Sequence, residues 1–385
     1  MLEQERTLSI SSSKCELRKS ASTGFYTFEF MKKLLLKLIA FIMAVAIIIV
    51  PGSIMVDPYN VFHPYTPRDN GIESNKSFIK TEYIKKHHDE FDSLVFGSSR
   101  AGFVDIGYLS DVTGERFYDM ASSESLVSEQ TVELKELIKS GFIPKSVWVL
   151  VDDISCFVDP KLHENMLYRV PYPAGGIIDR TEFYLKYMDL ITVCNSMQTI
   201  NENSVKKAAE QASGIDNSYD NSTHMSYLDR FYHTGTERLD KASQFNPNEE
   251  QYQIGYWTDY YSYRGEDALE DVKELVSLCN EYDINLKILT NPLYYLTYQR
   301  GVEEGYLEFL EGLATITDYY NFSGYSEVTC DYTNYYETSH FTPEVTRMMI
   351  DCVVGSRKPK GSFGVYVTSD NIGEFISMLR DEKVD

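Results

Sequence analysis

Two short stretches of the chain, about 240 positions apart, carry the residue types that nucleophilic catalysis needs. The first, residues 96–100, reads FGSSR and places two hydroxyls directly after a glycine. The second, residues 337–340, reads ETSH and stands just before Thr342 and Pro343, which are typical of the start of a helix. A serine becomes a nucleophile when an imidazole takes its proton and a carboxylate orients that imidazole. Together the two stretches predict a serine, a histidine base and an acidic partner.

A scaffold must bring these stretches together, and the apolar pattern of the chain predicts an open parallel sheet. The expected strands are the apolar runs at 93–96, 146–151, 285–289, 317–322 and 363–368. The expected helices, with apolar residues at helical spacing, are 127–139, 267–282 and 371–379. Strands that alternate with amphipathic helices are typical of α/β folds with helices on both faces of the sheet. In such folds, functional side chains gather at the carboxyl ends of the strands.

Two regions interrupt this alternating pattern. Residues 57–80 are rich in Pro, Asn and turn-forming residues, which indicates a stalk or lead-in. Residues 160–260 are rich in Asn, Ser, Tyr and Gln, with helix-like pieces near 178–200 and 204–212. We interpret this second region as an insertion over one end of the sheet, serving as a cap or a substrate-binding subdomain.

The N-terminal region predicts attachment to a membrane. Residues 38–56 contain no charged side chain over 19 positions, which is just long enough to cross the hydrocarbon layer as a helix. Residues 1–37 hold seven basic and four acidic groups, a balance that places them in the cytoplasm and residues 57–385 outside. A cleaved signal peptide is the alternative, although no A-x-A-like site follows. Met31 is an alternative start, because MKKLLLKLIAF reads like a native beginning.

Composition excludes several other roles. Lys and Arg number 36 against 58 Asp and Glu, a net charge of −22 that repels phosphate backbones and argues against binding nucleic acid. The six cysteines show no C-x-x-C motif and no metal-ligand spacing. His87 and His88 are adjacent, so their side chains would point to different faces of a helix or strand. We therefore expect no metal site, and the proposed chemistry needs no cofactor.

The FGSSR and ETSH stretches, in this order and after an export signal, resemble the SGNH/GDSL hydrolase superfamily, specifically its membrane-anchored bacterial branch with a G-S-S-R nucleophile block. The resemblance covers roughly residues 57–160 and 260–385. It implies a flavodoxin-like three-layer sandwich with Ser99 as nucleophile and His340 as base. The family's terminal block is Asp-x-x-His, so Glu337 stands where the family has aspartate, and Asp331 is a reserve candidate for that role.

Two blocks depart from the family pattern. The second block of the family donates an oxyanion N–H from a glycine, whereas the matching residues 119–124 read DMASSE. Any backbone N–H can donate, so the expected oxyanion donors are Ser99, Ser122 and Ser123. The third block normally carries an asparagine, but residues 151–155 read VDDIS, and a carboxylate repels an oxyanion unless it is protonated. The expected substrate contacts are Arg100, Asp152, Asp153 and Asn291.

Two functions follow from this pattern. The first is an anchored extracytoplasmic esterase or O-acyltransferase that acts on acyl esters of cell-envelope or extracellular polysaccharide through Ser99, His340 and Glu337. The resemblance implies an acylated glycan or cell-wall polymer as substrate and partners in envelope biosynthesis, including a membrane-bound acyltransferase. The second is a catalytically impaired scaffold or glycan-binding subunit of an envelope complex, which the altered second and third blocks favour.

Overall fold

The computed structural model describes residues 30–383 apart from 67, 69–71, 164–165, 213–218, 221–224, 227–244, 247 and 249–262. The chain divides into two compact units. The first unit combines the N-terminal region, to Val56, with Met188–Val193. The second unit, Asp57–Tyr187 and Cys194–Asp385, contains the main sheet and every residue of the predicted site.

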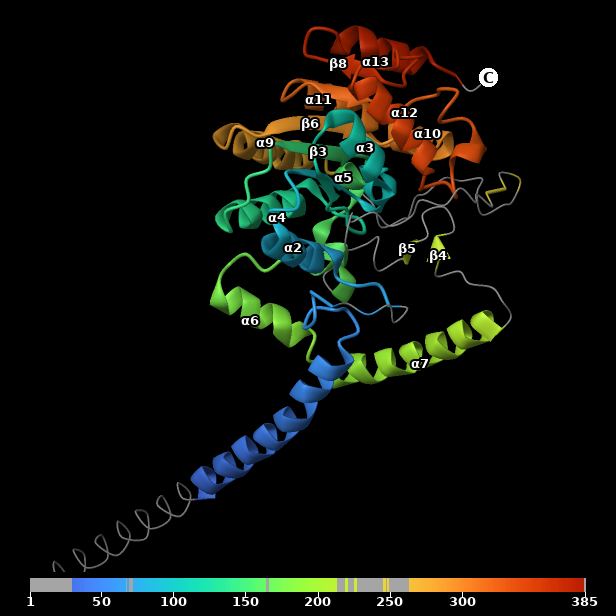
Figure 1. Cartoon of the computed structure of the whole chain (residues 1–385). Coiled ribbons are helices and arrows are strands. Elements are labelled where there is room, and N and C mark those ends of the chain that lie inside the picture. The colour runs from blue at the N-terminus through green and yellow to red at the C-terminus, as the bar shows by residue number, and fades with distance from the viewer. Residues whose placement is uncertain are drawn as a thin grey trace, which may run out of the picture. The chain divides into compact units, whose positions relative to one another are not determined.

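The main sheet of the second unit has six strands in the order β2-β1-β3-β6-β7-β8. Figure 1 labels β3, β6 and β8 of this sheet. The strands are β1 (Ser93–Gly97), β2 (Phe117–Asp119), β3 (Ser146–Val151), β6 (Asn285–Thr290), β7 (Tyr319–Asn321) and β8 (Val365–Val367). The first five run parallel, whereas β8 pairs antiparallel with β7. The parallel sheet predicted from the sequence is therefore confirmed for five strands, and the edge strand makes the whole sheet mixed.

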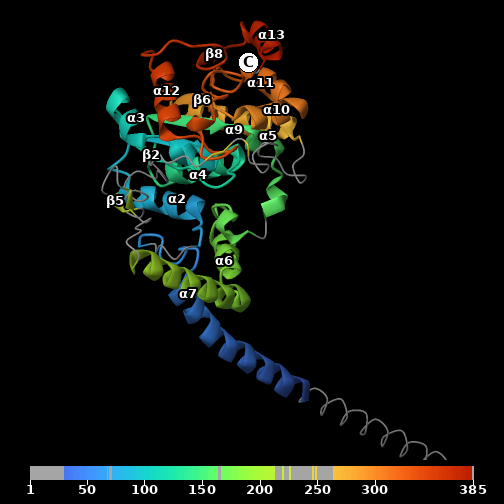
Figure 2. The same cartoon turned by 90° about the vertical axis from the view of Figure 1, so that its right-hand side faces the viewer.

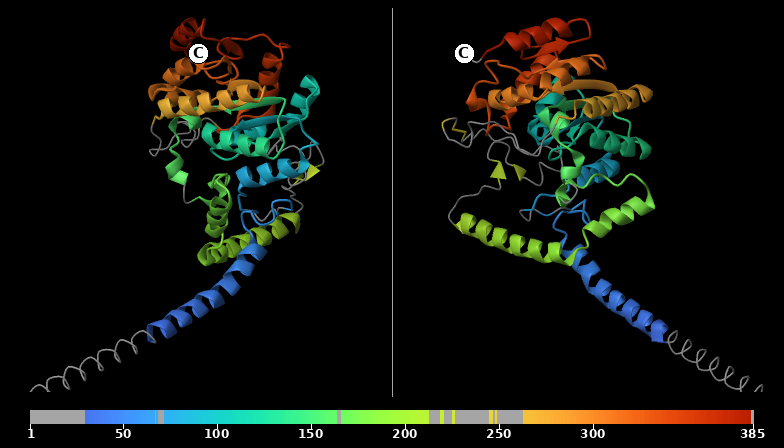
Figure 3. Two further views of the ribbon diagram at one scale, coloured as in Figure 1. Left: turned by 90° about the vertical axis from the view of Figure 1, so that its left-hand side faces the viewer. Right: turned by 180° about the vertical axis from the view of Figure 1, so that it is seen from behind.

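Successive side chains of the central strands enter two different cores, which makes the sheet the middle layer. Leu94 of β1 and Val147 of β3 lie in a core shared with α4 (Val127–Lys139), α9 (Gly265–Glu281), α11 (Tyr306–Ala314) and α13 (Ile372–Asp381). Val95 and Trp148 lie in the opposite core, with α3 (Ile106–Thr113) and α12 (Pro343–Val353). Figures 2 and 3 show α4 and α9 side by side along the first face.

Most predicted elements of the sheet are found within a few residues of their expected bounds. The prediction missed β2, which has three residues, and the helices α2 (Lys76–His87), α3, α10 (Tyr295–Glu303) and α11. The region 57–80 does not form an extended stalk in its described part. Val61, Phe78 and Ile79 are buried in a third core, together with Tyr172 and Phe183 of the predicted insertion.

The predicted insertion is only partly described. It contains the short helices η2 (Pro160–His163) and η3 (Leu167–Arg169), the helices α6 (Ile177–Lys186) and α7 (Leu190–Ala212), and the antiparallel pair β4 (Tyr219–Asp220) and β5 (Met225–Ser226). The helix-like piece predicted at 178–200 therefore divides between α6 and α7. Most of residues 213–262 lie outside the described residues, so the role expected for them as a cap stays a prediction.

The first unit contains one helix that is long and apolar enough to cross a membrane. This helix, Phe30–Val56, has 27 residues and a mean hydropathy of 2.8 over its most apolar window. It includes the uncharged stretch 38–56 found in the sequence. Residues 1–29, and with them Cys15, lie outside the described residues. Cys156, Cys279 and Cys352 are free thiols and are buried.

Candidate active site

Ser99 stands at a tight turn between a strand and a helix. β1 ends at Gly97, Ser98 is extended, and Ser99 is the first residue of the short 3-10 helix η1 (Ser99–Phe103). A Cβ atom on Gly97 would lie 2.6 Å from the Cβ of Ala101 and 3.1 Å from the carbonyl oxygen of Leu150 on β3. Only glycine allows this close approach without a shift of the neighbouring atoms. The turn leaves Ser99 partly exposed at the carboxyl end of the strand.

His340 lies in the loop between η5 (Tyr332–Asn334) and α12, and this loop is held by both backbone and side-chain hydrogen bonds. The amide of Tyr336 donates to the carbonyl of His340 at 2.8 Å, and the amide of Thr342 donates to Asn334 at the same distance. From α10 (Tyr295–Glu303), the buried Thr297 hydroxyl donates to the carbonyl of Thr338 at 2.6 Å. α12 begins at Pro343 after Thr342, as the sequence predicts, although the Thr342 side chain makes no capping bond.

The structure brings Ser99, His340 and Glu337 together in one hydrogen-bonded chain. Ser99 Oγ lies 2.9 Å from His340 Nε2. His340 Nδ1 is hydrogen-bonded to Glu337 Oε1. With the proton on Nδ1 donated to the carboxylate, Nε2 is free to accept the serine proton, which is the arrangement that general-base catalysis requires.

Glu337 also accepts two backbone hydrogen bonds from its own loop. The amide of His340 donates to Oε1 at 2.9 Å, and the amide of Ser339 donates to Oε2 at 2.7 Å. Partial burial by itself would raise the pKa of Glu337, but the hydrogen bond and charge of His340 and the Ser339 amide outweigh it, so that the pKa is lowered. Glu337 is therefore an ionised carboxylate at neutral pH, suited to stabilise an imidazolium.

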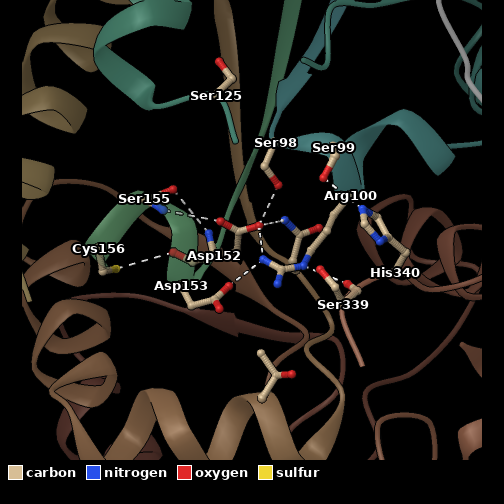
Figure 4. A network of polar contacts seen from close by, with 12 residues as sticks. Ser98, Ser99, Arg100, Ser125, Asp152, Asp153, Ser155, Cys156, Ser339 and His340 are labelled. Carbon is tan, nitrogen blue, oxygen red and sulfur yellow. Dashed lines mark hydrogen bonds and ion pairs between the residues drawn. The ribbon is translucent and has the colours of Figure 1, made fainter. Parts of the chain in front are cut away.

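A second, buried network lies beside these residues (Figure 4). Arg100, Asp152 and Asp153 are each about 1% exposed. Arg100 Nη1 donates to Asp152 Oδ2 at 2.7 Å and to Asp153 Oδ1, and Arg100 Nε donates to the carbonyl of Ser339 at 2.8 Å. Ser98 Oγ and Asn291 Nδ2 also donate to Asp152 Oδ2, at 2.8 Å and 2.9 Å. The four residues expected to contact substrate thus bind one another and are buried.

The backbone amides expected to stabilise an oxyanion differ in their surroundings. The amide of Ser122 donates to the carbonyl of Gly97 at 3.3 Å, so it is already engaged. Within the described part of the chain, the amides of Ser99 and Ser123 have no hydrogen-bond acceptor. The Ser123 hydroxyl donates to the carboxylate of Glu73. Of the three candidates, Ser99 and Ser123 are the two whose N–H groups remain available.

Two other sequence candidates lie apart from this arrangement. Asp331, the reserve partner for His340, accepts from the amide of Thr333 at 2.9 Å and from its hydroxyl, and so begins η5. His87 pairs with Glu90 at 2.8 Å on the surface. Among the residues that the structure describes, no group of three or more His, Cys, Asp or Glu side chains is placed to hold a metal ion.

Sequence reasoning missed two residues that hold the loops of the site. Thr297 fixes the carbonyl of Thr338 from α10. Lys80 of α2 is fully buried, and its Nζ donates at 2.7 Å to the carbonyl of Ala121, which precedes Ser122 and Ser123. No sequence signal singles out either residue, because a lysine in a Lys-rich segment and a threonine beside aromatic residues both have ordinary surface roles.

Comparison of the chain with protein-family models gives no match, and neither does comparison with curated protein sequences.

Proposed function

We propose that this chain is a membrane-anchored serine esterase or O-acyltransferase of the SGNH/GDSL type. One observation carries the proposal: Ser99 Oγ lies 2.9 Å from His340 Nε2, while Nδ1 of the same ring is hydrogen-bonded to Glu337. A serine, an imidazole and a carboxylate in this order form the arrangement that activates a hydroxyl for attack on an ester. In His340, one ring nitrogen contacts a partly exposed serine hydroxyl and the other an ionised carboxylate. A histidine with a purely structural role does not require this pair of partners.

In the proposed reaction, each of these residues has a role in acyl transfer. His340 Nε2 takes the proton of Ser99 as Oγ attacks the ester carbonyl, and Glu337 stabilises the imidazolium that forms. The amides of Ser99 and Ser123 are the candidate donors to the carbonyl oxygen as its negative charge develops. His340 then gives the proton to the departing alkoxide, which leaves an acyl group on Ser99. His340 then deprotonates water or a sugar hydroxyl as its oxygen attacks the acyl group, and the proton passes from His340 to Ser99 Oγ as the bond between Oγ and the acyl group breaks.

The architecture supports the family part of the proposal. In SGNH-type folds, the nucleophile follows the first strand of a parallel sheet, and the histidine precedes a late helix. Here Ser99 follows β1, His340 precedes α12, and five parallel strands lie between layers of helices. The departures in the second and third blocks concern the oxyanion donors. They bear on the rate rather than on the identity of the nucleophile, because losing one donor typically costs about 10²–10³-fold in rate.

The proposed substrates are acyl or acetyl esters on a cell-envelope or extracellular polysaccharide. Support comes from the apolar helix Phe30–Val56 and from Lys32, Lys33 and Lys37 near its N-terminal end, which precede the uncharged stretch 38–56 and favour an extracytoplasmic domain. An enzyme fixed in this way meets polymers at the outer face of the membrane. A membrane-bound acyltransferase that delivers acyl groups is the corresponding partner.

Labelling with a fluorophosphonate probe tests the proposal directly. The full-length chain in detergent is expected to be labelled, and Ser99→Ala and His340→Ala are expected to abolish the labelling. Ser98→Ala is the matched control, because Ser98 is the neighbouring serine and its hydroxyl is bonded to Asp152. It is expected to retain labelling. A folded wild-type chain that takes up no probe would instead support the scaffold or glycan-binding role, which keeps the fold without the chemistry.

A further inference from the structure

We infer that Arg100 is a positioning residue, which holds the backbone of Ser339 and thereby keeps His340 within reach of Ser99. Its side chain is 1% exposed, so it has no surface to offer a bound substrate. The kinetic part of this inference rests on the proposed function, because it concerns the same site. Its structural part, the fixing of the His340 loop, does not depend on catalysis.

The guanidinium of Arg100 connects two parts of the fold. Nη1 donates to Asp152 at the carboxyl end of β3 and to Asp153, the first residue of α5 (Asp153–Phe157). Nε donates at 2.8 Å to the carbonyl of Ser339 in the histidine loop. Because a guanidinium is planar and rigid, fixing Nη1 on the two aspartates also fixes the direction of the Nε–H bond.

The aspartate side of this connection is itself anchored to two neighbouring strands. Asp152 Oδ2 accepts from Ser98, which follows β1, and from Asn291, which follows β6. The carboxyl ends of β1, β3 and β6 therefore meet at one carboxylate oxygen. Arg100 extends from this rigid point to the histidine loop, which is also held by backbone contacts, by Thr297 and by Tyr335, whose hydroxyl donates to the carbonyl of Pro292 at 2.9 Å.

Two hydrogen bonds link the same pair of chain segments side by side. The side chain of Ser99 is hydrogen-bonded to the ring of His340. The side chain of Arg100, which follows Ser99, is hydrogen-bonded to the carbonyl of Ser339, which precedes His340. The amide of Ser339 meanwhile donates to Glu337. The backbone of Ser339 is thus held on both sides, and releasing its carbonyl would loosen His340 and Glu337 together.

Arg100→Lys is the informative variant. Lysine keeps the positive charge that the two buried aspartates require, whereas a neutral residue would leave them uncompensated and could unfold the chain. An ammonium group is a compact donor on a flexible stem and cannot reproduce the planar fork, so the bond to Ser339 is lost. Arg169→Lys is the matched control, because Arg169 is also buried, at 5% exposed, and its ion pair is with Glu129 on α4.

The experiment uses the full-length chain with histidine labelled with 15N, and it measures two quantities. The first is the second-order rate constant for fluorophosphonate labelling of the folded protein. The second is the NMR signal of the Nδ1 proton of His340, assigned among the seven histidines by its loss in His340→Gln. In Arg100→Lys we expect the rate constant to fall about 10²-fold, since displacements near 1 Å at a reacting group have effects of this size. We also expect the Nδ1 proton to exchange faster with water.

The outcomes separate this inference from the proposed function. A purely structural role for Arg100 would reduce the amount of folded protein but leave the rate constant and the Nδ1 proton of the folded fraction unchanged, and that result would overturn the inference. Equal effects in Arg169→Lys would also overturn it. If the wild-type chain takes up no probe, the proposed function fails, yet the Nδ1 proton still reports whether Arg100 holds the loop.

Discussion

At the scale of single residues, Glu337 binds both the ring of His340 and the backbone of its own loop. It stands three positions before His340 and accepts hydrogen bonds from the ring and the amide of His340 and from the amide of Ser339. The loop is therefore shaped around the same carboxylate that would stabilise the imidazolium. The additional methylene of glutamate, compared with the aspartate of the resembled family, is accommodated within this turn.

Replacing Glu337 by glutamine removes the negative charge of the side chain and keeps its shape. Glutamine retains an acceptor oxygen but cannot stabilise an imidazolium, so the labelling rate is expected to fall about 10²–10⁴-fold.

The pH dependence of stability provides a second test of the same carboxylate. Since the pKa of Glu337 is lowered on folding, its carboxylate stabilises the fold above its ordinary pKa of 4.5, and this contribution is lost as pH falls through the lowered value.

The expected result is a melting temperature for Glu337→Gln that is below wild type at pH 7 and converges with it in acid. Glu337→Asp serves as the control, because it keeps the charge and should retain most of the labelling rate. A glutamine variant that is labelled as fast as wild type would show that the carboxylate has no part in activating His340.

At the scale of elements, the contact between α2 and α4 contains a buried acid that costs stability. Glu133 of α4 is 1% exposed, and Ser77 of α2 donates to its Oε1. Burial raises the pKa of Glu133 to about 8, and the charge of Glu129 adds to this effect, while Ser77, Lys80 and Arg169 oppose it. The folded chain therefore holds a proton at neutral pH that the unfolded chain releases.

Glu133→Gln is accordingly expected to stabilise the protein. Below pH 4.5 both states of the wild type hold the proton, and the variant should differ little from it. Between pH 4.5 and about 8 the wild type loses stability, because only its unfolded state ionises. The variant should then be more stable by about 2–4 kcal/mol near pH 8. Thermal melts across this pH range measure the difference, and Glu311→Gln, an exposed position on α11, should show none.

The strand whose bounds the sequence predicts most accurately is the one whose burial is visible as an unbroken apolar run. SVWVLV at 146–151 is buried on both faces of the sheet and matches β3 at both ends. β2 was missed because three residues are too few to show a pattern, and its Asp119 is a charged residue in a buried strand. α2 was missed because Lys76 and Lys80, although buried, read as solvent-facing in a Lys-rich segment.

The same limit applies to the site. The approach of Ser99 and His340 could be anticipated because the carboxyl ends of parallel strands face one crevice, and both stretches adjoin that edge. The buried network of Arg100, Asp152 and Asn291 could not, because charged side chains are ordinarily exposed. Residue type indicated which groups can react. Only the fold shows that several of their neighbours contact one another instead of a substrate.

At the scale of the whole molecule, charge is distributed unevenly on the two sides of the uncharged stretch 38–56. Residues 1–37 carry +3 and the chain as a whole −22, so the remainder carries −25. Phe30–Val56 is long enough to span the hydrocarbon layer. The net positive charge before the uncharged stretch 38–56 comes from Lys32, Lys33 and Lys37 of this helix, and it favours a cytoplasmic N-terminus and an exported acidic domain.

Protease protection in bacterial spheroplasts tests this orientation. In a chain tagged at both ends, an added protease that cannot cross the membrane should remove the C-terminal tag and leave an N-terminal fragment that ends after the apolar helix. Disrupting the membrane, as the control, should expose both tags. A signal peptide would instead release a soluble C-terminal fragment without any protease.

Full protection of the C-terminal tag would place Ser99 and His340 in the cytoplasm. That result would exclude envelope polysaccharide as the substrate, but it would leave the chemistry of the Ser99–His340 pair open to a cytoplasmic ester. The orientation of one helix therefore determines which of the proposed substrates the site can meet, whereas the proposed reaction rests on the 2.9 Å contact between Ser99 and His340.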